Sequence, residues 1–345
     1  MFLDFYKLKE QPFGVTPDPR FLYLTPSHRE ALASLYYGVE TGRGFLSLIA
    51  KPGMGKTTLL FHLLEKFGKT ARTAFLFQTQ CNSREFLRFL LAELGCDTVD
   101  QDFVRMHDEF NKRLLQEARA GRRFIVVIDE AQNLSAEVLE TVRLLSDFET
   151  PRAKLMQIIL AGQPELADKL SSRELAQLRQ RISICNTLEQ LPEAEVVRYI
   201  EHRMRVAGYS GGVPFTADAL ALIASFSEGT PRNINNLCFN SLSLGCALKQ
   251  QIIPVSTVEE VISDLDLSRQ TTEPSPFRIP AGFDGSRFGL PNLEEEALTL
   301  AMGSAGSSVP KPMKAGSSSG RDEVLSPAEA RAYMQQVIQL LRNRR

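Results

Sequence analysis

The sequence lacks several features that would assign a chain to a broad class at once. Its 345 residues carry 40 Lys and Arg against 41 Asp and Glu, so no excess charge draws it toward nucleic acid or anionic membrane. The five cysteines include no Cys-x-x-Cys pair, and their odd number and wide spread exclude a disulfide framework and favour a reducing cytoplasm. No apolar run approaches the roughly 20 residues of a transmembrane helix. The start, MFLDFYKLKEQPFG, also lacks the basic-then-apolar order of a signal peptide.

What is present fits an ordinary globular protein with a sizeable core, since 43% of the residues are hydrophobic and 23% are charged. Short apolar runs alternate with segments of helical spacing, and the runs are GFLSLIA, RTAFLFQT, RFIVVIDE and KLMQIILAG. Strands that are apolar on both faces and alternate with helices are typical of a buried parallel sheet between helical layers. The fold class is therefore α/β, with three layers.

The pattern changes along the chain and predicts five segments. We expect an N-terminal arm, an α/β domain, a small all-helical domain, a Gly/Ser/Pro-rich linker that buries little, and a C-terminal amphipathic helix. Their bounds are residues 1–30, 31–190, 191–267, 268–325 and 326–343. Within the all-helical domain, helices are predicted over Leu191–Ala207, Thr216–Ser227, Pro231–Gln250 and Thr257–Leu267. The C-terminal amphipathic helix at 326–343 is either an association element or a frayed tail.

The clearest motif is LIAKPGMGKTTLL, in which a strand, a loop and a helix follow one another. In such a phosphate-binding loop, backbone N–H groups and the helix N-terminus surround the phosphates. Lys56 would neutralise phosphate charge, and the Thr57 hydroxyl would bind Mg²⁺. The residues expected to contact the nucleotide are Ala50, Lys51, Pro52, Gly53, Met54, Gly55, Lys56, Thr57 and Thr58.

Ala50 departs from the usual pattern, G-x-x-x-x-G-K-[ST], which has glycine at this position. It stands where the strand becomes the loop. Alanine is tolerated there if its φ is negative and no atom passes close to its Cβ, whereas Gly53 and Gly55 lie nearer the phosphates. The alternative to a phosphate-binding loop in this segment is a flexible turn beside a strand.

A second motif, RFIVVIDEAQ, ends an apolar strand on Asp129 and Glu130. Adjacent carboxylates at the end of a buried strand are costly unless they serve a cation or a water molecule. Asp129 would support Mg²⁺, and Glu130 would polarise the water that attacks the γ-phosphate. A solvated acidic turn is the alternative, but the nearby phosphate loop favours an ATP site.

Three further polar residues are candidates for sensing the γ-phosphate, and each has a structural alternative. Gln163 follows an apolar strand and would touch the attacking water, or it only forms a turn. Arg232, in SEGTPRNINNLC, would reach the phosphates from a helix capped by Thr230, or it is a solvated surface residue. Arg181 is favoured over Arg179 as an arginine finger for a neighbouring subunit, the alternative being an ion pair.

Together these motifs resemble AAA+ ATPases, and more narrowly the ExeA/GspA-type family associated with general secretion, pilus and exopolysaccharide export systems. The resemblance runs from about Tyr6 to Leu267 and includes YKLKEQPFGVTPDPRFLYLTPSHREAL, VVIDEAQNLSAEVLETVRLLSDFET, ILAGQPEL and EGTPRNINNLC. It implies a P-loop AAA+ core with a helical lid. Asp147 departs from the Asn that this family generally has.

The resemblance implies roles for the candidate residues. Lys56 and Thr57 would form Walker A, Asp129 and Glu130 Walker B, Gln163 sensor 1, Arg232 sensor 2, and Arg181 the finger. It implies ATP and Mg²⁺ as ligands, a homo-oligomer (a ring or a dimer), and a place at the inner membrane only through a partner. The family's membrane span and cell-wall region are not matched, so we do not expect a cell-wall role.

Two functions follow from these observations. The first is a cytoplasmic ATPase that switches or assembles a partner machine at an envelope export system, with the C-terminal helix as a contact. The second is an ATP-dependent DNA-binding protein of the transposition target-selection type. DNA binding needs Lys and Arg against phosphates. Beyond RAGRR and LRNRR the sequence has no basic run, so the second function is not favoured.

The loop glycines and Ala50 should respond differently to substitution. Ala50→Gly should change ATP affinity only slightly. Gly55→Ala should weaken binding severely, because a Cβ there opposes a backbone that must curl around phosphate. Equilibrium binding of a fluorescent ATP analogue would measure both, and equal losses in the two variants would contradict this account of Ala50.

Overall fold

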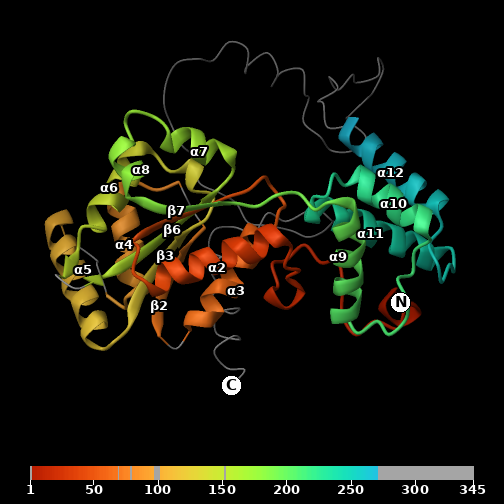
Figure 1. Ribbon diagram of the computed structural model, residues 1–345, viewed down its shortest axis with the longest axis horizontal. Coiled ribbons are helices and arrows are strands. Elements are labelled where there is room, and N and C mark those ends of the chain that lie inside the picture. Colours follow the sequence, from red (N-terminus) through yellow and green to blue (C-terminus); the bar gives the residue numbers. More distant parts are fainter. Residues whose placement is uncertain (1, 69, 78–79, 97–101, 151–152, 271–345) are drawn as a thin grey trace, which may run out of the picture. The chain divides into compact units, whose positions relative to one another are not determined.

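The computed structural model describes residues 2–270 except 69, 78–79, 97–101 and 151–152. Its central element is a five-stranded parallel sheet in the order β2-β3-β6-β1-β7 (Figure 1). The strands are β1 (Phe45–Ile49), β2 (Ala71–Leu76), β3 (Arg123–Ile128), β6 (Met156–Gly162) and β7 (Ile182–Thr187). The apolar segments expected to be strands all lie in this sheet, and β7 is the strand that follows Arg181.

Helices cover both faces of the sheet and give the three expected layers. Alternate side chains of β1 face opposite layers, as the two-residue period of a strand requires. Phe45 and Ile49 belong to the core that includes side chains of α4, α5 and α6. Leu46 lies against α2, where a Cβ at Gly38 would come within 2.6 Å of the Leu46 Cδ2. The helices of this part are α2 (Pro26–Glu40), α3 (Lys56–Phe67), α4 (Ser83–Glu93), α5 (Phe103–Arg119), α6 (Ala136–Leu145), α7 (Pro164–Leu170) and α8 (Ala176–Arg181).

Local chemistry explains where several of these helices begin. At the starts of α2, α4, α5 and α6 a backbone N–H donates to a side-chain oxygen, and the accepting residues are Thr25, Asn82, Asp102 and Ser135. A short antiparallel pair, β4 (Glu149–Thr150) and β5 (Ala153–Lys154), leads into β6. The sequence did not indicate this pair because its strands have only two residues each.

Within the described residues, four helices follow β7, in the order predicted. They are α9 (Glu193–Val206), α10 (Ala217–Phe226), α11 (Pro231–Ala247) and α12 (Val255–Gln270). The last of them continues past the expected boundary at residue 267. The rest of the expected linker, from residue 271 to 325, and the C-terminal helix at 326–343 lie outside the described residues.

The N-terminal arm packs on these helices. It contains two short turns, α1 (Phe2–Phe5) and the 3₁₀ helix η1 (Pro19–Phe21), between extended segments. The Tyr6 hydroxyl donates to the Gln250 carbonyl at 3.0 Å, and Arg203 Nε donates to the Pro12 carbonyl at 2.5 Å. The arm is therefore laid on a folded surface. Among the described residues, no helix combines the length and the apolar character needed to cross a membrane.

Candidate nucleotide site

The phosphate loop connects β1 to α3 and adopts a conformation that only glycine takes easily. Gly53 and Gly55 have φ values of 79° and 84°, in the left-handed region. Gly55 is also the N-cap of α3 and provides no side-chain cap, so the first N–H groups of this helix are left for a ligand. Free N–H groups at a helix N-terminus attract anions, and the twelve-residue α3 presents them here.

Ala50 is buried at the rim of this loop. Its N–H donates to the Gly162 carbonyl at 3.0 Å, so the residue extends the pairing of β1 with β6. Among the described non-glycine residues, positive φ occurs only at Lys7, Glu130, Glu228 and Lys249, and Ala50 is not one of them. The backbone condition under which alanine is tolerated is therefore met.

The other loop residues differ in exposure. Lys51 and Pro52 are exposed, Met54 is buried, and Thr58 is half-buried in the first turn of α3. Lys56 is only 5% exposed, which is unusual for lysine and shows that its ammonium lies inside the site.

Thr57 and Asp129 lie together beside the loop. The Thr57 hydroxyl donates to Asp129 Oδ2 at 2.6 Å. Burial raises the pKa of Asp129, although the bond from Thr57 and the charge of Lys56 act in the opposite direction. A hydroxyl and a carboxylate next to a phosphate-binding loop form the oxygen set with which Mg²⁺ is bound together with nucleotide phosphates. The residues present therefore fit this ion.

Glu130 lies at the end of β3 in an uncommon conformation. Its φ of 52° is in the left-handed region, which costs a non-glycine residue about 1–3 kcal/mol. Its Oε1 lies 3.4 Å from Lys56 Nζ, and its Oε2 accepts bonds from Gln132 Nε2 at 2.6 Å and Gln163 Nε2 at 3.0 Å. Burial raises the pKa of Glu130, but these bonds and the charge of Lys56 outweigh it, so the pKa lies below its ordinary value. The carboxylate is therefore ionised at neutral pH, as a base must be.

Gln163 and Arg232 reach the same site from different elements. Gln163 follows β6, at the N-terminus of α7, and its amide binds Glu130. The Arg232 N–H donates to the Gly53 carbonyl at 3.2 Å, and a Cβ at Gly53 would lie 2.7 Å from the Arg232 Cβ. Thr230 occupies the N-cap position of α11, but its side chain makes no capping bond, so that detail of the prediction was wrong.

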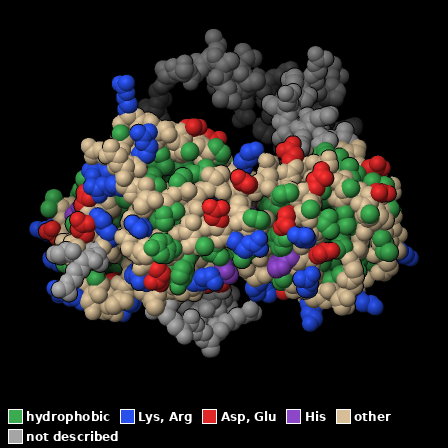
Figure 2. Space-filling view, in the orientation of Figure 1, with side chains coloured by type: hydrophobic (Ala, Val, Ile, Leu, Met, Phe, Trp, Pro, Cys, Tyr) green, Lys and Arg blue, Asp and Glu red, His purple; other side chains and the backbone are tan. Residues whose placement is uncertain are grey.

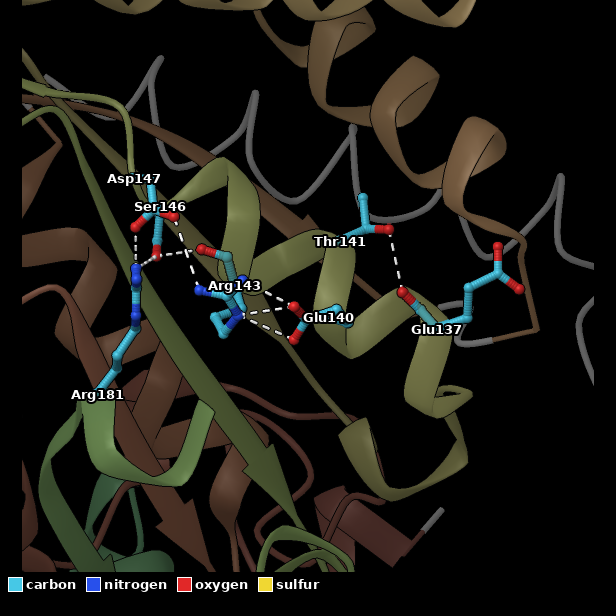
Figure 3. Close-up of polar contacts among 7 residues, drawn as sticks. All are labelled: Glu137, Glu140, Thr141, Arg143, Ser146, Asp147 and Arg181. Carbon is cyan, nitrogen blue, oxygen red and sulfur yellow. Dashed lines mark hydrogen bonds and ion pairs between the residues drawn. The ribbon is translucent and has the colours of Figure 1, made fainter. Parts of the chain in front are cut away.

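Arg181 makes its polar contacts elsewhere in the chain (Figure 3). Its Nη1 donates to the Ser146 hydroxyl at 3.1 Å and forms an ion pair with Asp147. Asp147 Oδ2 also lies 3.7 Å from Nη1 of Arg143, which pairs with Glu140. The candidate finger thus lies in an ion-pair network at the end of α6. Arg179, the less favoured candidate, donates to the Ser171 carbonyl at 3.3 Å.

His28 is a site residue that sequence analysis missed. It is 2% exposed in α2, and its Nε2 lies 3.1 Å from the Met54 carbonyl of the phosphate loop. Because a carbonyl only accepts, Nε2 carries the proton, and in the neutral ring Nδ1 accepts from the Thr25 hydroxyl at 2.6 Å. The segment TPSHREAL was visible in the sequence, but nothing local indicated that its histidine would meet the loop.

The neutral form of His28 should make stability depend on pH. Burial lowers the pKa of His28 from 6.5, against the effect of the Met54 bond, so the unfolded chain binds the proton more readily than the folded chain. The contribution of His28 is thus present above pH 6.5 and is lost as the pH falls through the folded-state pKa. Urea unfolding should show that the free-energy difference between wild type and His28→Gln shrinks below pH 6.5. A constant difference would contradict the neutral assignment, and His62→Gln is the control on a more exposed histidine.

Comparison with known proteins agrees with this geometry. Residues 39–170 match the family model described as an AAA domain. The chain is 37% identical over 243 residues to general secretion pathway protein A of Aeromonas hydrophila, covering 70% of this chain and 44% of that protein. It therefore spans less than half the length of this relative. A match at 24% identity over 311 residues, 87% of this chain and 82% of the other, is to the Holliday junction branch migration complex subunit RuvB of Parasynechococcus marenigrum (strain WH8102).

Solved structures support the fold. Cdc6p from Pyrobaculum aerophilum superposes with a TM-score of 0.57 at 19% sequence identity, over 84% of this chain and 76% of that chain. At this identity the likeness is one of fold alone. Taken with the sheet order, the phosphate loop and the paired acidic residues that end β3, these comparisons support an ExeA/GspA-type AAA+ ATPase.

Proposed function

We propose that this protein binds ATP with Mg²⁺, hydrolyses it, and uses the cycle as a switch or an assembly factor for a partner machine. One observation carries the proposal. The carboxylate of Glu130 lies between Lys56 and Gln163, beside the bonded pair of Thr57 and Asp129. A base, a phosphate-binding cation and a pair of metal-binding oxygens are thus collected from the ends of β1 and β3, and Gln163 joins them from the end of β6.

The contacts within this site suggest how its residues would act on ATP. The γ-phosphate would attract Lys56 away from Glu130, because a phosphate oxygen carries more charge than a carboxylate oxygen. Glu130 would then take a proton from the water that attacks the γ-phosphate, while Gln163 orients that water or the carboxylate. Thr57 and Asp129 would hold Mg²⁺, which would supply positive charge against the phosphates.

The helices after β7 would serve as the lid of the switch. Arg232, at the start of α11, contacts the phosphate loop through its backbone N–H, so a small change at Gly53 reaches this helix directly. Its guanidinium would register the γ-phosphate by charge-assisted hydrogen bonds. ATP binding would therefore close these helices on the nucleotide, and hydrolysis would release them.

The partner machine is proposed from relationship alone. The relative at 37% identity is named general secretion pathway protein A, and the match covers 70% of this chain. We infer that the partner is an envelope secretion or polysaccharide export system, reached from the cytoplasm at the inner membrane. The C-terminal helix, which lies outside the described residues, is the proposed contact.

DNA binding of the transposition target-selection type remains the alternative, and the face of the described residues seen in Figure 2 does not favour it. Figure 2 shows Lys and Arg interspersed with Asp and Glu on the face it presents, without a large area of one sign. A duplex would need a basic stripe against its phosphates. Duplex binding that depends on ATP and weakens steeply with salt would nevertheless replace the secretion proposal.

Two variants test the ATPase assignment. Lys56→Ala should abolish ATP binding, because it removes the buried cation that faces the phosphates. Glu130→Gln should bind ATP normally but lower kcat by about 10²–10⁴-fold, the range expected when a general base is lost. Phosphate release and equilibrium ATP binding, measured on the same preparations, check both. Turnover by Glu130→Gln at the wild-type rate would refute the assignment of the base.

We also propose that a second copy of the chain completes the site through Arg181. For this, Arg181 must leave Asp147 and Ser146 and enter the neighbour's nucleotide site. Arg181→Ala should then lower kcat by up to about 10³-fold without loss of ATP binding. Asp147→Asn, which removes the ion-pair partner but keeps the arginine, should remain active.

Mixing variants separates this role from an intrachain brace. Lys56→Ala supplies an intact Arg181, and Arg181→Ala supplies an intact nucleotide site, so the mixture should recover activity that neither variant has alone. If the mixture is as inactive as its components, the finger assignment fails and Arg181 acts only within its own chain.

A further inference from the structure

Gln132 lies two residues after Glu130, in the 3₁₀ turn η2 (Ala131–Asn133), and both ends of its amide are used. Its Nε2 donates to Glu130 Oε2 at 2.6 Å. Its Oε1 accepts from the backbone N–H of Gln163 at 3.2 Å. One planar amide therefore joins the carboxylate after β3 to the backbone after β6.

The surrounding chain holds Gln132 in this place. Lys169 Nζ, from α7, donates to the Gln132 carbonyl at 2.9 Å and also to the Leu134 carbonyl. A Cβ at Gly162 would lie 2.6 Å from Gln132 Oε1, so the absence of a side chain at the end of β6 makes room for the amide. Backbone and side chain of Gln132 are thus fixed by the β6–α7 segment.

The two oxygens of Glu130 have different partners as a result. Oε2 is held by the neutral amides of Gln132 and Gln163, whereas Oε1 faces the ammonium of Lys56 at 3.4 Å. A phosphate that draws Lys56 away frees Oε1. It leaves the bonds from the two amides intact, because the amides are neutral and are attracted to the phosphate much less than the lysine is. The site therefore assigns one carboxylate oxygen to orientation and the other to chemistry.

We propose that Gln132 is a positioning residue for ATP hydrolysis, which holds Glu130 Oε2 so that Oε1 accepts the proton. This inference rests on the proposed ATPase function and deepens it. In the step, the water oxygen bonds to the γ-phosphorus as its proton passes to Oε1. The bond from the γ-phosphorus to the bridging oxygen breaks, and its electron pair leaves with ADP.

A kinetic comparison in the full chain tests the proposal. Gln132→Ala should lower kcat by about 10- to 100-fold, the loss expected when a reacting group is misplaced by about 1 Å. The KM for ATP and the equilibrium affinity for ATP should stay within about 2-fold of wild type, since Gln132 stands behind the base. Asn133→Ala, at an exposed position of the same turn, is the matched control and should keep wild-type kcat.

A double variant shows whether Gln132 acts through Glu130. In a Glu130→Gln background the base is already lost, so adding Gln132→Ala should reduce the residual turnover no further. A reduction by the same factor as in wild type would overturn the proposal, as would an unchanged kcat in Gln132→Ala alone. Loss of ATP affinity together with kcat would assign Gln132 a structural role instead.

Failure of the underlying ATPase proposal gives a different result. The ATPase proposal fails if Lys56→Ala still binds ATP or if Glu130→Gln turns over at the wild-type rate, and both variants leave Gln132 intact. The positioning proposal fails when those variants behave as expected and Gln132→Ala does not.

Discussion

The parallel register of three neighbouring strands is the constraint on which this site depends. β1 pairs with β6 through Ile49 and Gly162, and β6 pairs with β3 through Leu160 and Ile128. Parallel strands end at one edge of the sheet, where ligands of open α/β sheets bind. The phosphate loop, the acidic pair and Gln163 each follow one of these ends, so residues far apart in sequence meet within hydrogen-bonding distance.

The charged and polar groups of the site compensate one another. Lys56 faces Glu130, and Thr57 donates to Asp129, so neither the buried ammonium nor the buried carboxylate lacks a partner. An unpaired charge in such a place would be costly. ATP with Mg²⁺ would offer each group a stronger partner, and on the proposed cycle binding exchanges one set of contacts for the other without leaving a charge exposed to an apolar interior.

Segments outside the motifs hold the site in shape. The His28 ring of α2 donates to the Met54 carbonyl of the phosphate loop. Lys169 of α7 donates to the Gln132 carbonyl in the turn after Glu130, and the Arg232 N–H of α11 donates to the Gly53 carbonyl. The arm that precedes α2 packs on the helices after β7. The loop is thus tied to elements on either side of it in sequence, which gives a change at the nucleotide several routes into the rest of the chain.

The sequence by itself predicted four of the five strands of the main sheet, the helices after them, and Lys56, Thr57, Asp129 and Glu130 as candidate site residues. Those features depend on hydrophobic period and on chemistry within a few neighbouring residues, both of which are written locally. Only the tertiary structure decided that Gln132 would bridge Glu130 to Gln163, that His28 would meet Met54, and that Arg181 would pair with Asp147. Each of these contacts joins elements that the fold brings together, and an amide, an imidazole or a guanidinium on a helix gives no sign in the sequence of which distant group it will face.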